Sequence, residues 1–554
     1  MTETTSNIDH RAERAQKLSI LMTTWPSVTG SDGEAEFAGR LKTLLAESPY
    51  FSAHPDQLFT RESHGEPKRE NLFALVRGKG RRTLVLAGHF DTVSIANYGS
   101  LAPLATEPDT LMRALVDELS AKPSLNSAEA KALADLRSGD FLPGRGLLDM
   151  KSGLAAGIVA LERFAEFDEP PGNLLFVATP DEENRSRGMI SLRNALPEIA
   201  RDFDLDIIGG INLDSTSDEA DGADGRALYL GSVGKYSPFA FVVGCPTHAG
   251  YAYQGVSAHL ISAEIIRAIE FNDRLCDEAF GETSPAPVCL EGRDVRHGYE
   301  VTTPAHVWLS FNWLTHRKSS LDMLAGFQSI VEGALETALD TQRSSAQRYF
   351  ALQGKQPPLS YQGRVLTYGE VRNLVRARGG EDALARLAAR EAALAGENDQ
   401  LAISRELVAA SVTEAGLEGP AVIIGFSSLH YPMVHIDQTG DKGRAFHDRL
   451  KQAIAVIVTR HGTTISTKQF FAGISDMSFF GHRPDAANSG VLIDNTPAAT
   501  LSDHPPSDLL AFPVVNIGPW GRDYHQKWER VHAPYTFGVL PDLIHEAALR
   551  CLRD

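Results

Sequence analysis

Five side chains that can bind a metal ion follow five separate segments of this chain, and four of those segments are typical of buried strands. The five residues, in chain order, are His89, Asp149, Glu183, Asp214 and His525. Two imidazoles and three carboxylates suit a pair of divalent ions such as Zn²⁺. In open α/β sheets, ligands bind beyond the carboxyl ends of the strands, where side chains from distant parts of the sequence converge. The pattern therefore predicts an α/β fold that carries a two-metal site.

Length and composition indicate an ordinary soluble protein with more than one domain. At 554 residues the chain is too long for a single core, and its 43% hydrophobic content allows large ones. The net charge of −18 argues against a nucleic-acid partner, because no basic surface offsets phosphate repulsion. No apolar run approaches the roughly 20 residues that span a bilayer, and the N-terminus lacks a signal-peptide core. The four cysteines have no CxxC spacing, so we expect a cytoplasmic enzyme with neither a disulfide framework nor a membrane partner.

The first part of the chain alternates strand-like and helical segments. FALVRG and TLVLAG, separated by the polar turn GKGRR, resemble two paired strands, and the second is apolar at nearly every position. Further buried strands are expected at 173–180 and 206–212, with helices between them. This alternation predicts a mostly parallel sheet flanked by helices. Residues 95–143 contain four prolines and are expected to form a surface excursion or substrate-facing loop, with a helix around 109–120.

After about residue 231 the chain changes to a strand–helix–strand–helix pattern of its own. This pattern predicts an inserted α+β lid domain with an antiparallel sheet. Within it, residues 368–416 are rich in Ala, Arg and Glu and are expected to form a solvated amphipathic pair of helices. The first pattern returns near residue 440. The predicted domains are therefore a discontinuous catalytic domain, 1–231 and 436–554, and an insert, 232–435.

Taken alone, most of the candidate ligands have an alternative explanation. A histidine at a strand end is usually structural or solvated. Asp149 could be the N-cap of the helix that follows it, and Asp214 could cap a turn. His525 and Glu529 have the spacing of one helix face, which is a weak indication by itself. The metal site is therefore predicted from the ordered set rather than from any single member.

Two pairs of neighbouring residues strengthen the metal-site hypothesis. Asp91 lies two positions after His89, and its carboxylate can accept the ring N–H and so select the nitrogen that faces the metal. Glu182 and Glu183 leave a buried strand together. One of them can bind a metal ion while the other, pointing differently, moves protons.

Longer motifs around these residues are similar to those of a known family. They are LAGHFDTV, GRGLLDMKSG, TPDEENRSRGM, NLDSTS, GCPTHAGYAYQGVSA and GPWGRDYHQKWE. They resemble the dizinc metallopeptidase family that contains acetylornithine deacetylase, succinyl-diaminopimelate desuccinylase, aminoacylases, tripeptidases and carboxypeptidases. LSFNWLTHRKS, GISDMSFF and the long lid resemble its arginine-utilisation branch, which suggests a role in amino-acid metabolism. The sequence departs from the family's usual pattern at three points: Ser94, Ser152 with Gly153, and a spacing of 60 positions from His89 to Asp149. These departures leave every ligand in place, and the longer excursion is expected to reshape substrate access.

The resemblance implies a role for each of these residues. Asp149 would bridge two metal ions, and Glu182 would be the general base. The two metal sites would consist of His89, Asp149 and Asp214, and of Asp149, Glu183 and His525. A cis peptide bond after Asp149 is also implied. His248, which by itself could be an ordinary polar residue at a strand end, would approach the active centre, often across a dimer interface, and donate to the substrate carbonyl oxygen.

The expected activity is hydrolysis of an amide bond in a small amino-acid derivative or short peptide, by water bound between two divalent ions. Zn²⁺ is favoured, with Co²⁺ and Mn²⁺ as alternatives. Arg317 and Arg522 are candidates to bind a substrate carboxylate, and Asn312 is a candidate to face the site. A homodimer through the lid domain is implied by the resemblance. An exopeptidase acting on longer peptides and a regulatory protein with a retired active site are the alternatives.

Overall fold

The structure, a computed structural model, divides into two compact units, which are described separately. It describes residues 5–217, 222, 224–296, 298–357, 360–471 and 473–553. Unit 1 comprises Met1–Ser232, Val434–Arg483 and Pro506–Asp554, and unit 2 comprises Val233–Met433 and Pro484–Pro505. The chain therefore leaves unit 1 twice and returns to it twice.

Unit 1 is built on an eight-stranded mixed sheet with a parallel centre. Its strands, in spatial order, are β1 (Leu58–Ser63), β2 (Arg69–Val76), β5 (Asn173–Thr179), β3 (Arg82–His89), β6 (Asp206–Asn212), β20 (Val514–Asn516), β8 (Ala227–Tyr229) and β19 (Ser466–Lys468). The strands β5, β3, β6 and β20 run parallel, so their carboxyl ends meet at one edge of the sheet. This confirms the predicted α/β class.

The predicted pairing of β2 with β3 is wrong. β5 lies between them, antiparallel to β2 and parallel to β3. A gap of one strand is about 10 Å wide, which residues 77–81 can cross. All seven residues of β5 are buried. This apolar strand therefore gains more from a central position than the chain would gain from a local hairpin.

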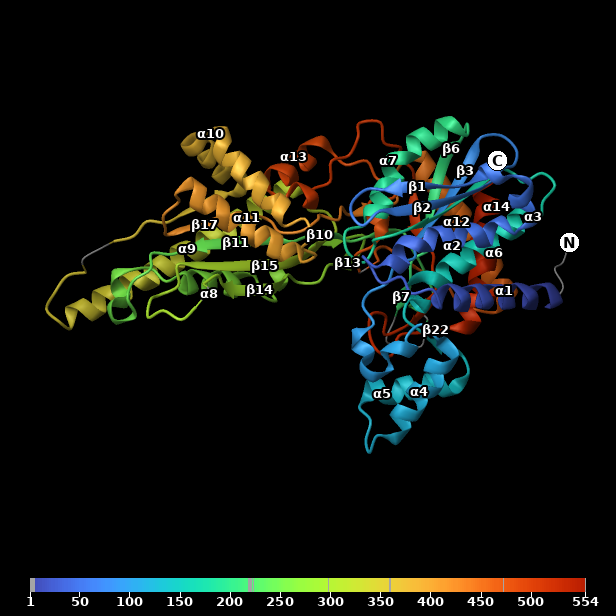
Figure 1. The fold of residues 1–554 in the computed structure, drawn as a ribbon, viewed down its shortest axis with the longest axis horizontal. Helices are drawn as coiled ribbons and strands as arrows, with labels where there is room; N and C mark the ends of the chain where they lie inside the picture. The colour runs from blue at the N-terminus through green and yellow to red at the C-terminus, as the bar shows by residue number, and fades with distance from the viewer. Residues whose placement is uncertain are drawn as a thin grey trace. The chain divides into compact units, whose positions relative to one another are not determined.

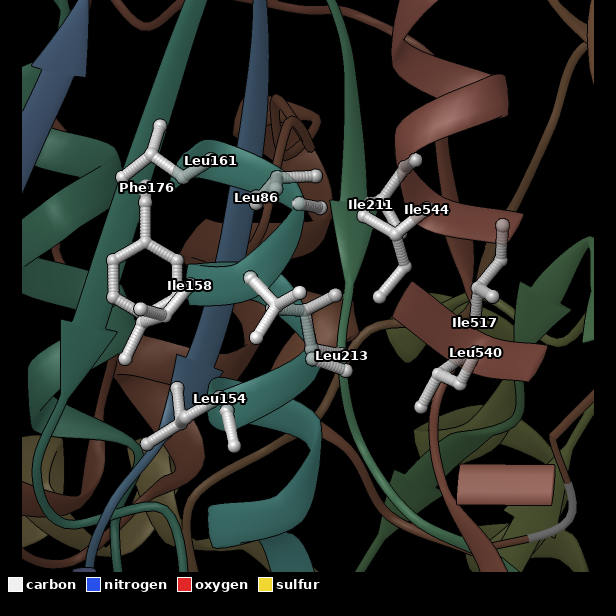
Figure 2. Packing of buried hydrophobic residues seen from close by; sticks show 14 of the residues in the cluster. Leu86, Leu154, Ile158, Leu161, Phe176, Ile211, Leu213, Ile517, Leu540 and Ile544 are labelled. Carbon is white, nitrogen blue, oxygen red and sulfur yellow. The ribbon is translucent and has the colours of Figure 1, made fainter. Parts of the chain in front are cut away.

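Helices pack against both faces of the sheet (Figure 1). The helices of unit 1 are α1 (Thr5–Thr23), α2 (Asp32–Ala46), α3 (Pro49–Ala53), α4 (Pro108–Ala121), α5 (Ser127–Ser138), α6 (Ser152–Ala165), α7 (Arg187–Asp202), α12 (Asp441–His461) and α14 (Leu540–Leu552). Figure 2 shows Ile158 of α6 beside Phe176 of β5, with Leu86 of β3 in the same cluster. Leu175 and Val177, which alternate with Phe176, are also fully buried, so both faces of β5 are covered.

A smaller four-stranded sheet joins distant parts of unit 1. Its strands, in spatial order, are β4 (Phe141–Pro143), β22 (Arg530–His532), β21 (Trp520–Arg522) and β7 (Thr216–Ser217). The short strands β9 (Gly231–Ser232) and β18 (Val434–His435) form a separate pair. The predicted excursion at 95–143 contains the 3₁₀ helix η2 (Ala96–Leu104), α4 and α5, which enclose a small apolar core of their own.

Unit 2 is an α+β unit with a mostly antiparallel sheet. Its strands, in spatial order, are β10 (Gly234–Tyr236), β15 (His306–Thr315), β11 (Pro238–Val243), β17 (Ala421–Phe426) and β16 (Arg364–Thr367), with β14 (Val288–Asp294) paired to β15. Its helices are α8 (Ala258–Ile269), α9 (Ser320–Ala351), α10 (Tyr368–Ala393), α11 (Gln400–Ala415) and α13 (Ala486–Asn495). The helices α10 and α11 are the pair expected at 368–416. None of the helices among the described residues of either unit is long and apolar enough to cross a bilayer.

One segment lies in a different unit from the one that the sequence predicted. Residues 484–505 were expected within the catalytic domain but pack with unit 2. The Ser320 hydroxyl donates to the carbonyl oxygen of Asn488 at 2.8 Å, and the backbone N–H of Gly369 donates to Asn495 Oδ1 at 3.1 Å. Val491 also packs against the core of unit 2. These contacts join positions more than a hundred residues apart, which a local pattern does not report.

Candidate metal centre

Two groups of metal-binding side chains lie just beyond the parallel strands of unit 1 and share one carboxylate. Within each group the potential ligand atoms all lie within 4.8 Å of one another. The groups are His89, Asp149 and Asp214, and Asp149, Glu183 and His525. The fold of unit 1 thus brings together all five predicted ligands, and Asp149 is the member common to both groups.

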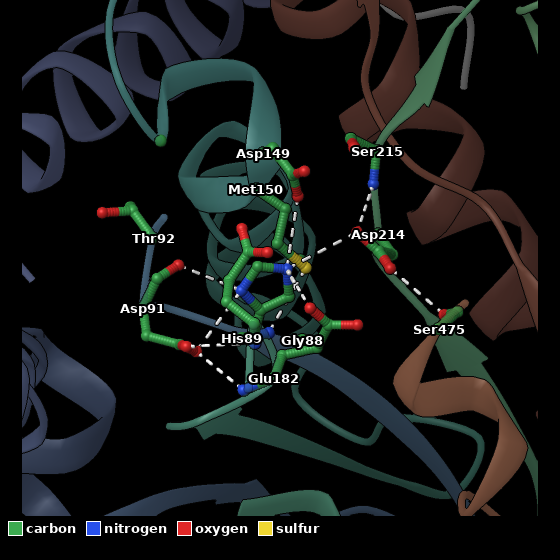
Figure 3. A network of polar contacts seen from close by, with 12 residues as sticks. Gly88, His89, Asp91, Thr92, Asp149, Met150, Glu182, Asp214, Ser215 and Ser475 are labelled. Carbon is green, nitrogen blue, oxygen red and sulfur yellow. Dashed lines mark hydrogen bonds and ion pairs between the residues drawn. The ribbon is translucent and has the colours of Figure 1, made fainter. Parts of the chain in front are cut away.

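His89, the last residue of β3, is surrounded by carboxylates (Figure 3). Its Nε2 lies 3.3 Å from Asp149 Oδ1, 3.6 Å from Asp214 Oδ1 and 3.9 Å from Glu182 Oε2. Its Nδ1 lies 3.5 Å from Asp91 Oδ1 and 3.1 Å from the Asp91 carbonyl oxygen. Burial lowers the pKa of His89, but the hydrogen bonds to the aspartates outweigh it and raise this pKa well above the usual value. The ring therefore presents Nε2 to the centre while Asp91 holds the other nitrogen.

Asp149 lies on the short π-helical turn η3 (Leu147–Lys151) that leads into α6. The peptide bond between Asp149 and Met150 is cis, as the resemblance implied. Asp149 is not the N-cap of α6, because Lys151 occupies that position. Its carboxylate faces two histidines instead, with Oδ1 3.3 Å from His89 Nε2 and Oδ2 3.1 Å from His525 Nε2. Burial raises the pKa of Asp149, but its hydrogen bonds to His525 and His89 lower this pKa below the usual range.

Glu182 and Glu183 follow β5, and their side chains diverge. Asp91 accepts the backbone N–H of Glu182 at 3.0 Å and that of Glu183 at 3.2 Å. The Glu183 carboxylate lies 3.1 Å from His525 Nε2, whereas Glu182 Oε2 lies 3.9 Å from His89 Nε2. Burial raises the pKa of Glu182 well above its usual value, and the charge of His89 opposes this only in part. Glu183 is thus grouped with ligands, while Glu182 belongs to neither group and stands beside His89 of the first.

A buried network of charged side chains holds Asp181, the residue before Glu182 and Glu183. Asp181 has a left-handed backbone, with φ of 67°. Its carboxylate accepts from Arg69 Nη1 at 2.8 Å and from Arg187 Nε at 2.5 Å. Arg69 also donates to Glu34 at 3.1 Å, and the side chains of Arg69, Glu34 and Asp181 are fully buried. This network could not be predicted from the sequence, because its members are charged residues with no distinctive spacing.

Asp214 is held by residues from the last third of the chain. Its backbone N–H donates to Asn516 Oδ1 at 3.1 Å, and Asn516 Nδ2 donates to its carbonyl oxygen at 2.9 Å. The Ser475 hydroxyl donates to its Oδ2 at 3.1 Å. Burial raises the pKa of the neighbouring Asp476 to about 8. Asn516, Ser475 and Asp476 were not among the predicted site residues, although the motif GISDMSFF contains two of them.

His525 lies on the turn between β21 and β22 and not on a helix, so the proposed shared helix face with Glu529 is wrong. The turn bends through left-handed residues, with φ of 56° at Asp523 and 64° at His525. The His525 side chain is 43% exposed, in contrast to the buried His89. The hydrogen bonds to Asp149 and Glu183 outweigh burial and raise the pKa of His525 to about 10.

Arg522 is not available as a substrate-binding residue. Its side chain is buried, and its Nη1 donates to Asp135 Oδ2 at 2.6 Å. The guanidinium also lies over the rings of Trp520 and Phe141, at 5.3 Å and 5.2 Å from their centroids. This arginine therefore stabilises the small sheet. The sequence could not show this because Asp135 belongs to the excursion, far away in the chain.

The remaining candidates, His248, Arg317 and Asn312, belong to unit 2. His248 is exposed, and its Nδ1 accepts the backbone N–H of Gly250 at 3.1 Å. Arg317 is exposed, and Asn312 lies half-buried on β15. Their predicted roles stay predictions.

The donor set fits two divalent metal ions. It consists of imidazole nitrogens and carboxylate oxygens, which are ordinary ligands of Zn²⁺. Four carboxylates with side chains at most 10% exposed surround the two histidines; they belong to Asp149, Glu182, Glu183 and Asp214. Carboxylates crowded in this way repel one another, and divalent cations would balance their charge.

The sequence is similar to known proteins over nearly its whole length. The sequence matches the profile of peptidase family M20/M25/M40 over residues 127–504. It is 31% identical to the uncharacterized protein YqjN of Bacillus subtilis (strain 168) over 524 residues, which cover 94% of this chain and 93% of that protein. It is 27% identical to protein RocB of the same organism, with 98% of this chain and 96% of that protein covered.

Among solved structures, a tripeptidase from Staphylococcus aureus has a similar fold. The TM-score is 0.52 at 16% sequence identity, with 98% of this chain and 99% of that chain covered. The family profile covers more than half of the sequence, and the relatives are similar over nearly its whole length. This chain therefore belongs to peptidase family M20/M25/M40.

Proposed function

We propose that this protein is a dimetal hydrolase that cleaves an amide bond in a small amino-acid derivative or a short peptide. One observation carries the proposal: two ligand groups share Asp149, and the carboxylate of Glu182, which belongs to neither group, lies 3.9 Å from His89 Nε2 of the first. Membership of a peptidase family supports a hydrolase acting on peptide-type bonds.

In this proposal, His89 and Asp214 would complete one metal site and Glu183 and His525 the other, with Asp149 bound to both ions. Zn²⁺ suits the mixed nitrogen and oxygen donors best, and Co²⁺ and Mn²⁺ accept similar sets. When bound, such ions polarise a carbonyl group and lower the pKa of water toward neutrality.

Glu182 would be the group that moves protons. It would accept a proton from the attacking water and donate that proton to the leaving nitrogen as the amide bond breaks. Its burial supports this role, because burial raises the pKa of the carboxylate well above its usual value and so makes it a stronger proton acceptor. Asp91 would position His89, Glu182 and Glu183, since it contacts the His89 ring and accepts the backbone N–H groups of the two glutamates.

Unit 2 would supply substrate recognition. His248 would donate to the substrate carbonyl oxygen, and Arg317 would bind a substrate carboxylate, with Asn312 as a further polar contact. A fall in kcat for His248→Ala, and a rise in KM alone for Arg317→Ala, would support these roles. Unchanged kinetics in either variant would remove that residue from the mechanism.

A second copy of this chain is the proposed partner of unit 2. β14 is an edge strand, because β15 is its only partner strand among the described residues. Leu290 in β14 is 54% exposed. Strand edges with exposed apolar side chains readily pair with other strands. Light scattering should give a dimer for the wild type and a monomer for Leu290→Lys.

A substrate panel tests the proposed function. The metal-free protein would be loaded with Zn²⁺, Co²⁺ or Mn²⁺ and assayed with N-acyl amino acids, dipeptides, tripeptides and longer peptides. Turnover of the small substrates that a chelator abolishes supports the proposal. Turnover of only the longer peptides would favour the exopeptidase alternative. Tight metal binding without turnover of any member would favour a regulatory protein with a retired site.

A further inference from the structure

The excursion at residues 95–143 packs against the turn that carries His525. Its helices α4 and α5 lie beside each other, away from the large sheet of unit 1 (Figure 1). They enclose a separate apolar core, against which Trp528 from the far end of the turn packs. The ammonium group of Lys122 lies 5.7 Å from the centre of the same indole ring. An insertion near the start of the chain thus contacts a loop near its end.

The turn needs support from outside because its own backbone is unfavourable. Asp523 and His525 both adopt positive φ angles, 56° and 64°, which are less favourable than negative φ angles for residues with a side chain. The His525 side chain is also 43% exposed, so packing around the ring holds it only in part. Its position therefore depends on contacts to the backbone of the turn.

Those contacts come from the excursion and the residues that follow it. The carbonyl oxygen of His525 accepts from Asn97 Nδ2 at 2.9 Å and from Arg145 Nη2 at 3.4 Å. Arg145 also donates to Asn97 Oδ1 at 2.9 Å and forms an ion pair with Glu529. The Glu529 carboxylate accepts the backbone N–H of Gly146 at 3.0 Å. Arg145 and Glu529 are buried, so one connected network joins both ends of the turn.

Ion pairs hold the strands on either side of the turn to the same helices. Asp135 of α5 accepts from Arg522 of β21 at 2.6 Å and from Arg530 of β22 at 2.7 Å. Glu118 of α4 pairs with Lys527 at 2.6 Å. The helical excursion therefore contacts the two strands that flank the turn, the His525 carbonyl oxygen within the turn, and Lys527 and Trp528 near its end.

We infer that the excursion is a clamp that positions His525 as a ligand of the second metal ion, with Asn97 and Arg145 as its positioning residues. The inference rests on the proposed dimetal function. The first group, His89 with Asp214, needs no such clamp, because both side chains are buried at the ends of β3 and β6. Loosening the clamp should therefore weaken one metal site and spare the other.

Metal titration tests the clamp without an activity assay. Metal-free wild type and variants would be titrated with Zn²⁺ against a chromophoric chelator, which resolves the two equivalents. Asn97→Ala removes the nearer of the two donors to the His525 carbonyl oxygen, and Asn97 is exposed, so the protein should fold normally. We expect the affinity for the second equivalent to fall about tenfold, as is usual when a residue that orients a ligand is removed, and the first to stay within twofold.

Two further variants separate positioning from general loosening. Asn97→Asp keeps an acceptor for Arg145 but has no donor for the His525 carbonyl oxygen, so it should behave like Asn97→Ala. Arg137→Ala is the matched control, because its guanidinium bonds Ser120 within the excursion, and it should leave both equivalents unchanged. An equal loss of both equivalents, or no loss in either Asn97 variant, overturns the clamp. A wild type that binds fewer than two ions overturns the dimetal centre itself, and the clamp with it.

Discussion

His89 and His525 face opposite oxygens of one carboxylate. Nε2 of His89 lies 3.3 Å from Asp149 Oδ1, and Nε2 of His525 lies 3.1 Å from Asp149 Oδ2. The two histidines come from β3 and from the turn before β22, at opposite ends of the sequence. The centre is therefore complete only when the N-terminal and C-terminal segments of unit 1 have folded together around Asp149.

Asp149→Asn should weaken both metal sites at once. The amide keeps the size of the side chain but removes the negative charge that both groups share. Ligands must be anionic or neutral donors with free lone pairs, and an amide is a poor substitute for a bridging carboxylate. Elemental analysis after dialysis at fixed free Zn²⁺ should give fewer ions per chain than for the wild type, for which the proposed dimetal centre predicts two. Asp140→Asn, at an exposed carboxylate outside both groups, is the control. Full metal content in Asp149→Asn would contradict the bridging role.

Glu182→Gln should lower kcat by about 10²- to 10⁴-fold, the usual contribution of a general acid–base group, while both metal ions stay bound. The amide cannot take a proton from water, and Glu182 belongs to neither ligand group. Steady-state kinetics and metal analysis of the same sample check this. Glu183→Gln is the matched variant and should lose metal as well as activity, because Glu183 is a member of the second group. Equal metal loss in both variants would assign Glu182 to the ligands instead.

Arg69→Met should destabilise unit 1 by about 3–5 kcal/mol, because it leaves Glu34 and Asp181 buried without their shared cation. Chemical denaturation followed by circular dichroism measures this loss. The control is Arg61→Met, which breaks only ion pairs to the exposed Glu198 and Asp202 and should cost less than about 1 kcal/mol. Similar losses in the two variants would mean that the buried network contributes no more than surface pairs.

Acid should destabilise the protein in part through His545. His545 lies on α14, and its burial lowers the pKa of the imidazole to about 3. The unfolded chain protonates this ring near pH 6.5, so it binds more protons than the folded protein between about pH 6.5 and 3. Stability is therefore lost as the pH falls through this window, at up to about 1.4 kcal/mol per pH unit. His545→Phe, which keeps a ring for Phe167 to stack on, should flatten this dependence in denaturation curves measured from pH 7 to about 4. His10→Phe, at an exposed position of α1, should not.

The order of the ligands and the class of the fold are local properties of the sequence. β3, β5 and β6 can be recognised as short apolar runs, and His89, Glu183 and Asp214 lie at or shortly after the ends of those runs. A strand covered on both faces must be apolar throughout, and ligands in such sheets gather at the carboxyl ends. For this reason the metal site could be predicted before any strand was paired with another.

Only the tertiary structure decided the order of the strands in the sheet and the contacts that hold the site residues in place. β5 separates β2 from β3, Asn516 and Ser475 hold Asp214, and Asp135 binds Arg522. The apolar sequences of β2, β3 and β5 predict burial but not the order of the strands, and the local sequences around the polar contacts are equally compatible with exposure to solvent. Hydrogen bonds and ion pairs depend on the distance and angle between two groups, and neither quantity is encoded in the residues adjacent to either group. The chemistry of the centre can therefore be read along the chain, whereas the contacts that hold it in place exist only in the folded protein.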